Sequence, residues 1–243
     1  MRNVKVVVEY DGTDYFGFQY QPKVPTVQGE LERVLSRIVK ERVTVYGSGR
    51  TDAGVHATGQ VINFRTCGSI PVEKICLAMN SLLPASIAAL QAEEVDDDFH
   101  SRYSAKSRLY RYDILNRDLR SALIGRYSWH VSRELNVDAM REAATCLEGV
   151  RDFESFCTSR EDEMTVRNIT RIGVDRQGEH VIIEIGANAF LRSMVRVIVG
   201  TLAEVGTGKR HWSEVGKILE ARDRKVAGKT APPQGLCLMH VEY

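Results

Sequence analysis

Residues 46 to 60 read YGSGRTDAGVHATGQ and separate two apolar runs, at 43–46 and 61–64, that have the composition of short strands. Gly and Ser occupy five of the fifteen positions, so the segment predicts a loop between those strands. Arg50 and Asp52 lie in the middle of this loop. They are open to two interpretations: a solvated ion pair without a role, or a catalytic carboxylate beside a cation that handles its substrate.

The residues on either side of the loop predict the order β-α-β-β-α-β, which is the split βαβ arrangement. A Val-rich run that ends at the Asp11-Gly12 turn signal is typical of a first strand. Thr26 is a suitable cap for a helix in which apolar residues recur at helical spacing. The predicted elements are strands at 4–10, 43–46, 61–64 and 87–95, a helix that follows Thr26, and a helix at 70–82.

The second half of the chain repeats this order. Its predicted elements are a strand at 109–115, a helix at 136–147, a hairpin of strands at 166–174 and 181–185, a long helix at 189–205, a further helix at 211–221 and a final strand at 236–241. Two halves of similar order predict an α/β (α+β) fold built as a pseudo-repeat, with two α/β sandwiches and a cleft between them. We expect the boundary between Ser101 and Ser107.

The composition favours a soluble intracellular protein. The 243 residues are 43% hydrophobic, enough for a substantial core in one large domain or two smaller ones. Lys plus Arg number 33 against 32 Asp plus Glu, so net charge does not indicate a nucleic-acid partner. The five cysteines form no C-x-x-C pair, which fits reduced thiols and gives no zinc site. The first residues do not resemble a signal peptide, and no run has the length of a membrane span.

Cations and aromatic residues are interleaved between residues 99 and 120, FHSRYSAKSRLYRYDILNRDLR. Six Lys or Arg residues stand against Asp113 and Asp118. Cations neutralise phosphates, and aromatic rings offer stacking surfaces to unpaired bases. In a strand, Tyr110 and Tyr112 would share one face. An exposed β face with ordinary strand aromatics explains the same composition, so both interpretations stay open at this point.

The predicted helix at 189–205 carries Arg192 and Arg196 four residues apart, hence on one side of an otherwise apolar helix. In one interpretation both side chains reach solvent. In the other, one of them meets a buried carboxylate, for which Asp52 is the candidate.

Two further interpretations of the loop at 46–60 fail on their details. Its glycines resemble a phosphate-binding loop, but the Gly-Lys-Ser/Thr ending that supplies the lysine and the magnesium ligand is missing. Asp52 and His56 could both reach a metal ion, but no further His or Cys follows at ligand spacing. We therefore expect His56 to be structural or to face RNA.

The segment GRTDAGVHA around Asp52 resembles the signature of the tRNA pseudouridine synthase A (TruA) family. VEYDGTDYFGFQYQP and TVQGELERVL resemble the opening of that family, and FHSRYSAKSRLYRYDI, NAFLRSMVRVIVG and APPQGLCLMHVEY resemble its later blocks, in the same order. The resemblance covers essentially the whole chain. Residues 101–103 read SRY where many members read ARF, which keeps a cation and an aromatic residue.

The resemblance implies roles for individual residues. Asp52 matches the catalytic nucleophile and Arg50 the base-flipping arginine. Tyr110 matches the tyrosine that stacks on the target base, and Arg196 the basic residue paired with the aspartate. An RNA-contacting segment is implied at Phe99, His100, Ser101, Arg102 and Tyr103, with Arg102 as the phosphate ligand.

The resemblance also implies an activity and a fold. The family isomerises uridine to pseudouridine at positions 38, 39 and 40 in the anticodon stem-loop of tRNA, without a cofactor or a metal, as a cytoplasmic homodimer. Its two ferredoxin-like halves form an extended, mostly antiparallel sheet with a central RNA-binding cleft. Residues 1–103 would carry the catalytic Asp loop, and residues 104–243 the stacking tyrosine and the arginine-bearing helix.

The chemistry of this reaction accounts for the residue types. The N1–C1′ bond of uridine breaks, and the base is rejoined to the ribose through C5. A carboxylate helps by attacking C1′ or C6, or by taking the C2′ proton, and the sequence does not choose among these routes. Each route needs an ionised Asp52 in a closed site, which is the reason to expect a cation such as Arg196 beside it.

Two other classes of protein stay open. Paired ferredoxin-like domains also occur in non-catalytic RNA-binding modules, although the K/R-G-F-G-F-V type of run is missing here. A family member that has lost its activity would bind tRNA as a folding chaperone, which the intact Asp52 argues against.

Overall fold

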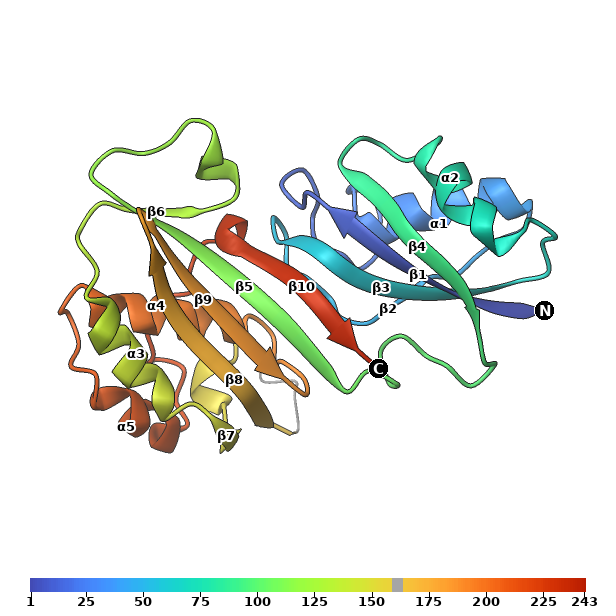
Figure 1. Cartoon of the computed structure of the whole chain (residues 1–243). Coiled ribbons are helices and arrows are strands. Elements are labelled where there is room, and N and C mark those ends of the chain that lie inside the picture. The colour runs from blue at the N-terminus through green and yellow to red at the C-terminus, as the bar shows by residue number, and fades with distance from the viewer. Residues whose placement is uncertain (159–163) are drawn as a thin grey trace. The chain divides into compact units, whose positions relative to one another are not determined.

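The computed structural model describes residues 1–158 and 164–243, which form two compact units (Figure 1). The first unit comprises Met1–Lys106 together with Cys237–Tyr243, and the second comprises Ser107–Leu236. This division differs from the predicted halves, 1–103 and 104–243, chiefly at the end of the chain. The last strand groups with the first unit because β10 (Leu236–Glu242) pairs in parallel with β3 (His56–Thr66).

The first unit has the predicted β-α-β-β-α-β order. Its elements are β1 (Arg2–Tyr10), α1 (Val27–Val39), β2 (Tyr46–Gly47), β3, α2 (Val72–Asn80) and β4 (Ile87–Val95). The strands lie in the order β4-β1-β3, β2 also pairs with β3, and all of these pairs are antiparallel. This is the ferredoxin-like, split βαβ arrangement, so the predicted fold class is confirmed for this unit.

Local sequence explains where these elements form. The valines at positions 4, 6 and 8 of β1 are fully buried, which is the alternation of a strand with one face in the core. Helix α1 begins where predicted, because the Thr26 hydroxyl accepts the backbone N–H of Gly29 at 3.3 Å. Leu31 and Leu35 then recur one turn apart and are both fully buried.

Two strand boundaries in this unit differ from the prediction. Strand β3 begins at His56, five residues before the predicted start at Val61, and β2 is confined to Tyr46–Gly47. The early part of β3 contains Gly59, which has a low strand propensity. Pairing of Ala57 with both β1 and β10 nevertheless holds it in the sheet. Long-range pairing therefore outweighs local propensity here.

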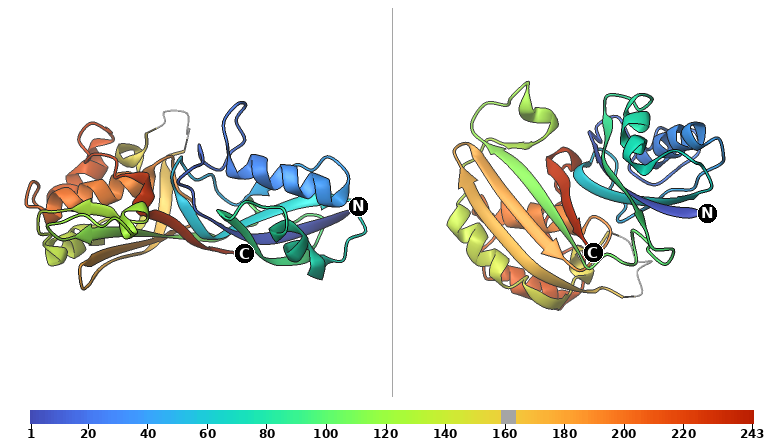
Figure 2. Two further views of the ribbon diagram at one scale, coloured as in Figure 1. Left: turned by 90° about the horizontal axis from the view of Figure 1, so that it is seen from above. Right: turned by 45° about the vertical axis from the view of Figure 1, so that its right-hand side comes forward.

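The second unit is also an α/β unit (Figure 2). Its strands are β5 (Ser107–Asn116), β6 (Trp129–Val131), β7 (Gly149–Asp152), β8 (Val166–Gln177) and β9 (His180–Ala187), and its helices are α3 (Val137–Thr145), α4 (Met194–Gly206) and α5 (Glu214–Ala221). Short 3-10 turns occupy Ile124–Arg126, Glu154–Phe156 and Pro233–Gly235. The strands lie in the order β5-β9-β8-β7 with antiparallel neighbours, and β6 pairs in parallel with β5. The predicted hairpin is the pair β8–β9.

Helix α4 begins at Met194 rather than at the predicted Ala189. Ser193, just before it, has a left-handed backbone with φ of 58°, which a continuous helix does not allow. Arg192 therefore lies outside the helix, and the predicted stacking of Arg192 on Arg196 does not form. Every residue of α4 except Arg196 is buried. Among the described residues, no helix is long and apolar enough to cross a membrane.

The close approach of α4 to a later segment gives a test of the fold. A Cβ on Gly200 would lie 1.7 Å from the backbone carbonyl oxygen of Lys229, so Gly200→Ala must push the two backbones apart. We expect this variant to lose about 1–3 kcal/mol or more of unfolding free energy. Gly216→Ala in α5 is the matched control, because nothing lies within 4 Å of its Cβ, and we expect it to gain up to about 1 kcal/mol. The stability of both variants is measured by urea unfolding. Unfolding free energies that change in the same direction would contradict the close packing of Gly200 against Lys229.

Candidate active site

The loop that carries Asp52 leads into β3, and its residues differ in burial. Thr51 is buried, Asp52 is half-buried and Arg50 is exposed. The backbone carbonyl of Asp52 accepts the N–H of Val55 at 3.2 Å, which closes a tight turn directly after the carboxylate. The loop thus presents the Arg50 and Asp52 side chains while Thr51 anchors the loop.

A buried hydrogen-bond network holds the inward side of this loop. The hydroxyls of Thr51 and Tyr10 lie 2.8 Å apart. The side-chain amide of Gln60 donates to the Tyr10 hydroxyl at 3.4 Å and to the Gly49 carbonyl at 2.9 Å, and its own oxygen accepts from the Ser48 hydroxyl at 2.6 Å. The loop is therefore tied to β1 through Tyr10 and to β3 through Gln60.

The environment of Tyr10 keeps this network in one protonation state. Burial raises the pKa of the Tyr10 hydroxyl far above its ordinary value, and the hydrogen bonds from Thr51 and Gln60 offset only part of that effect. The phenol therefore stays neutral at every physiological pH. Its hydroxyl fixes the orientation of the Thr51 side chain.

The segment between β1 and α1 clamps the loop from its other side. Phe18 N–H donates to the Thr51 carbonyl at 3.1 Å, and Gly54 N–H donates to the Tyr15 carbonyl at 3.3 Å. Gly17 lies between these contacts with φ of 92°, and a Cβ there would lie 2.8 Å from the Thr51 carbonyl oxygen. Sequence reasoning assigned no role to this segment. The glycine between two aromatic residues in YFGF was the signal for a close backbone approach.

His56, at the start of β3, has a structural position. The side chain is buried, its Nδ1 accepts the N–H of Gly12 at 3.1 Å, and the Asp11 carboxylate lies 3.2 Å away. His56 thus joins β3 to the turn that follows β1. Within residues 1–158 and 164–243, no group of three or more His, Cys, Asp and Glu side chains is placed to hold a metal ion.

The predicted RNA-contacting segment, residues 99–103, is anchored through Ser101. This residue is fully buried: its N–H donates to Asn63 at 2.9 Å, its hydroxyl donates to the Tyr46 carbonyl at 2.7 Å, and its carbonyl accepts from the Tyr243 hydroxyl at 2.8 Å. The Phe99 ring packs on Tyr243, with 4.9 Å between ring centroids. These contacts give Ser101 and Phe99 anchoring positions in the first unit.

Two rings of the same segment, His100 and Tyr103, form a row with Tyr46. The centroid of His100 lies 5.0 Å from that of Tyr46 and 4.5 Å from that of Tyr103. Tyr103 is 77% exposed, and the guanidinium of the exposed Arg102 lies 5.7 Å from its ring centroid. A cation beside a cluster of tilted, partly exposed rings is suited to phosphates and unpaired bases.

An open hollow of about 570 Å³ lies beside this segment. It is lined by Glu94, Val95, Asp96, Asp98, Phe99 and Ser104. Its carboxylates repel phosphates, and it lies away from the loop of Asp52. The hollow is therefore not a candidate for the reaction site or for a polyanion.

In the second unit, Tyr110 is a buried residue of β5. It is 8% exposed and meets Phe190 edge to face, with 5.1 Å between ring centroids. Tyr112, on the same side of the strand as predicted, is fully buried and donates its hydroxyl to the Pro232 carbonyl at 2.7 Å. Burial raises the pKa of Tyr112 well above its ordinary value, against the lowering effect of the nearby Arg196 charge.

Arg196 projects from the first turn of α4. Its Nε donates to the Ala231 carbonyl at 2.8 Å, and its own carbonyl accepts the Ala231 N–H at 3.0 Å. The side chain is half-buried, whereas Arg192 is exposed. Of the two arginines considered in the sequence, Arg196 is thus the one in a defined environment.

The structure divides the predicted site residues between the two units. Asp52, Arg50 and the segment 99–103 belong to the first unit, and Tyr110 and Arg196 belong to the second. Each unit holds its own residues in defined positions. The pairing of Asp52 with Arg196 stays a prediction.

Comparison with known proteins gives matches along the whole chain. The family model described as tRNA pseudouridine synthase matches residues 6–104 and 143–243. A tRNA pseudouridine synthase A from Thermoanaerobacter sp. (strain X514) is 47% identical over 244 residues, covering 100% of both chains. One from Halalkalibacterium halodurans is 50% identical over 238 residues, covering 97% of this chain and 90% of the relative. A crystal structure of a Cbf5-Nop10-Gar1 complex aligns with 97% of this chain and 48% of its own, at 14% identity and a TM-score of 0.37.

The clamp on the Asp52 loop gives a second test. We expect Gly17→Ala to lower the melting temperature more than Gly178→Ala, although both positions have positive φ, at 92° and 61°. Both variants lose about 1–2 kcal/mol to left-handed backbone strain. Only Gly17→Ala adds a contact with the Thr51 carbonyl, whereas nothing lies within 4 Å of a Cβ at Gly178. Equal shifts in a thermal unfolding experiment would show that the clamp contributes nothing.

Proposed function

Because this chain belongs to the tRNA pseudouridine synthase family, and is therefore an isomerase that converts uridine to pseudouridine in tRNA, we propose that its targets are the uridines at positions 38, 39 and 40 of the anticodon stem-loop. The observation that carries the proposal is the Asp52 loop. It has the GRTDAGVH sequence, and the buried contacts of Thr51 hold its backbone while Asp52 stays half-buried.

Asp52 is the proposed catalytic residue. The reaction breaks the N1–C1′ bond, turns the uracil and joins C5 to C1′. C5 loses a proton and N1 gains one, so the product is an isomer of the substrate. The carboxylate acts by attack on C1′ or C6, or by removal of the C2′ proton. Each of these routes demands a carboxylate held at a short and constant distance from the nucleoside, which a loop fixed from both sides provides.

Arg196 is the proposed partner of Asp52. A carboxylate enclosed with a base loses its hydration, and a neighbouring guanidinium compensates for that loss and keeps it ionised. The contact between Arg196 Nε and the Ala231 carbonyl supports this role, because it orients the guanidinium plane before substrate binds.

Arg50 and Tyr110 are proposed to handle the base. A base in a stem must leave its stack, at a cost of a few kcal/mol. Stacking on Tyr110 recovers about 1–3 kcal/mol, and the exposed Arg50 can occupy the space that the base leaves. The T-shaped contact with Phe190 fixes the orientation of the Tyr110 ring, which favours a ring that is ready to stack.

Contacts with the rest of the tRNA are proposed for the exposed part of residues 99–103. Arg102 is the phosphate ligand, and the rings of His100 and Tyr103 face the RNA. Ser101 and Phe99 contribute by anchoring the segment, which their buried contacts support. A cytoplasmic homodimer also belongs to the proposal. Its support is the resemblance to the family, and sedimentation of the purified protein measures it.

The position of the target uridine is tested directly by tritium release. Transcripts of tRNA carry 5-tritiated uridine at position 38, 39 or 40 alone, with EDTA present and no nucleotide added. We expect release from each transcript and none from a transcript labelled only outside the anticodon arm. Release from other positions would reject the proposed targets, and tight binding without release would favour an RNA-binding protein without catalysis.

The role of Asp52 is tested by Asp52→Asn. The amide keeps the shape of the side chain but removes its charge and nucleophilicity, so we expect tRNA binding without detectable tritium release. Asp138→Asn is the matched control, since that carboxylate in α3 is 92% exposed, and full activity is expected. Measurable conversion by Asp52→Asn would remove Asp52 from the chemistry.

The role of Tyr110 is tested by comparing two substitutions. If the ring stacks on the base, Tyr110→Phe keeps most of the single-turnover rate, and Tyr110→Ala loses far more, about 5- to 150-fold for 1–3 kcal/mol. A Phe variant as slow as the Ala variant would show that the hydroxyl acts in proton transfer, against the stacking role.

A further inference from the structure

Residues 226–231, here called the strap, follow α5 without regular secondary structure and run along α4. From residue 226 to residue 231, their contacts run from the C-terminal end of α4 to its N-terminal end. The strap meets Arg210 beyond the end of α4, then Thr201 and Gly200 in its middle, and finally Arg196 in its first turn. The strap is thus fastened at both ends and in the middle to the helix that carries the proposed partner of Asp52.

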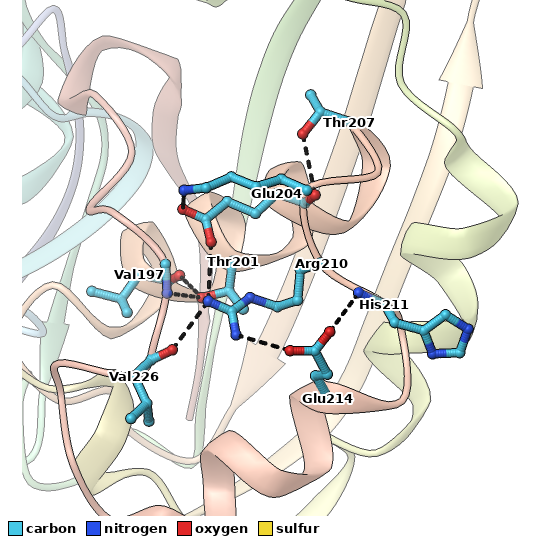
Figure 3. A network of polar contacts seen from close by, with 10 residues as sticks. Val197, Thr201, Glu204, Thr207, Arg210, His211, Glu214 and Val226 are labelled. Atoms are coloured by element: carbon cyan, nitrogen blue, oxygen red, sulfur yellow. Dashed lines mark hydrogen bonds and ion pairs between the residues drawn. The ribbon is translucent and has the colours of Figure 1, made fainter.

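The middle of the strap is held by a buried hydroxyl. Thr201 is fully buried, its Oγ1 donates to the Val197 carbonyl at 2.8 Å, and it accepts the Gly228 N–H at 2.9 Å (Figure 3). Both hydrogen-bonding functions of the hydroxyl are used, so its orientation is fixed. Gly200 and Gly228 bring the two backbones into direct contact at this point, because a Cβ on either would collide with the other segment.

The outer end of the strap is held by an ion-pair cluster. Arg210 donates to the Val226 carbonyl at 3.1 Å and contacts the carboxylates of Glu204 at 3.1 Å and Glu214 at 3.6 Å (Figure 3). Lys209 also binds Glu204, at 3.0 Å. Burial acts to raise the pKa of Glu204, but hydrogen bonds from Lys209 and Arg210 outweigh it, and the pKa lies below its usual range. The cluster therefore stays charged at neutral pH.

The inner end of the strap meets Arg196. Ala231 donates its N–H to the Arg196 carbonyl and accepts from Arg196 Nε. An arginine side chain has several free torsions, and a hydrogen bond at Nε removes most of that freedom. The position of the Ala231 carbonyl thus decides where the guanidinium points.

We propose that the strap is a positioning device for the reaction, in which Thr201 and Arg210 act through Ala231 to hold the guanidinium of Arg196 in its working orientation. This inference rests on the proposed function, in which Arg196 pairs with Asp52. Thr201 and Arg210 are positioning residues: they touch neither the substrate nor the reacting atoms, and their effect on the rate passes through Arg196. A misplacement of about 1 Å in such a group lowers the rate by about 100-fold.

The first test replaces the buried hydroxyl. Thr201→Val keeps the shape of the side chain and removes the acceptor for Gly228, and Thr201→Ser restores it. We expect the single-turnover rate of Thr201→Val to fall about 10- to 100-fold with unchanged tRNA affinity, and Thr201→Ser to recover most of the rate. A folded Thr201→Val with the rate of the wild type, or a Ser variant as slow as the Val variant, would overturn the proposal.

The second test works at the outer end, where substitution leaves the core intact. Arg210→Ala removes the contact with Val226, whereas Lys209→Ala also removes a partner of Glu204 but touches no strap residue. We expect Arg210→Ala to lower the single-turnover rate and Lys209→Ala to leave it unchanged. Both variants are expected to lose a similar amount of melting temperature. Equal rates for the two variants would mean that the cluster serves stability alone.

A double-mutant cycle decides whether the effect passes through Arg196. In the Arg196→Leu background, we expect Thr201→Val to cause no further loss of rate, because the group that it positions is gone. A further 10-fold loss would overturn the proposal. Wild-type protein that releases no tritium from tRNA would reject the proposed function itself, and a fully active Arg196→Leu would reject the role of Arg196. If the wild-type protein is active and Thr201→Val has the same single-turnover rate, only the positioning role of the strap is rejected.

Discussion

The hydrogen bond between the hydroxyls of Tyr10 and Thr51 is the contact on which the candidate site depends. It joins the end of β1 to a loop that otherwise consists of small residues with little apolar surface to bury. Thr51 is buried by this contact, whereas its neighbour Arg50 is exposed and its neighbour Asp52 is half-buried. A buried hydroxyl without a partner costs free energy, so Gln60, which completes the network, is as much a part of this geometry as Thr51.

The second unit uses the same physical device on different elements. There too, irregular chain is placed by polar side chains that reach backbone carbonyls: Tyr112 binds Pro232 and Arg196 binds Ala231. In the first unit Asp52 stands on an irregular loop that neighbouring strands hold, whereas in the second unit Tyr110 and Arg196 stand on β5 and α4. Such preorganisation reduces the reorganisation that accompanies the reaction, which is the largest contribution to many enzymatic rates.

Periodicity and capping predicted most of the secondary structure because these signals are local. Strand β4 has its predicted bounds, 87–95, and α1 starts after its predicted cap, Thr26. The early start of β3 and the late start of α4 were missed. The start of β3 depends on pairing with β1 and β10. The start of α4 depends on the left-handed backbone of Ser193, which a serine in the sequence does not indicate. Asp52 was found through its motif, but its supports Tyr10 and Gln60 were not, since their partnership exists only in the folded chain.

The placement of β10 has a consequence for how the chain reaches its native state. The first unit needs residues 237–243, which follow the second unit in the chain, to pair with β3 and to anchor Ser101 through Tyr243. Bringing together segments so far apart in the chain costs conformational entropy, and this slows folding. During synthesis, the sheet of the first unit can be completed only after the second unit has emerged. The segment 99–103 acquires its final anchor at that same moment. Anchoring of residues 99–103 is thereby coupled to synthesis of the whole second unit.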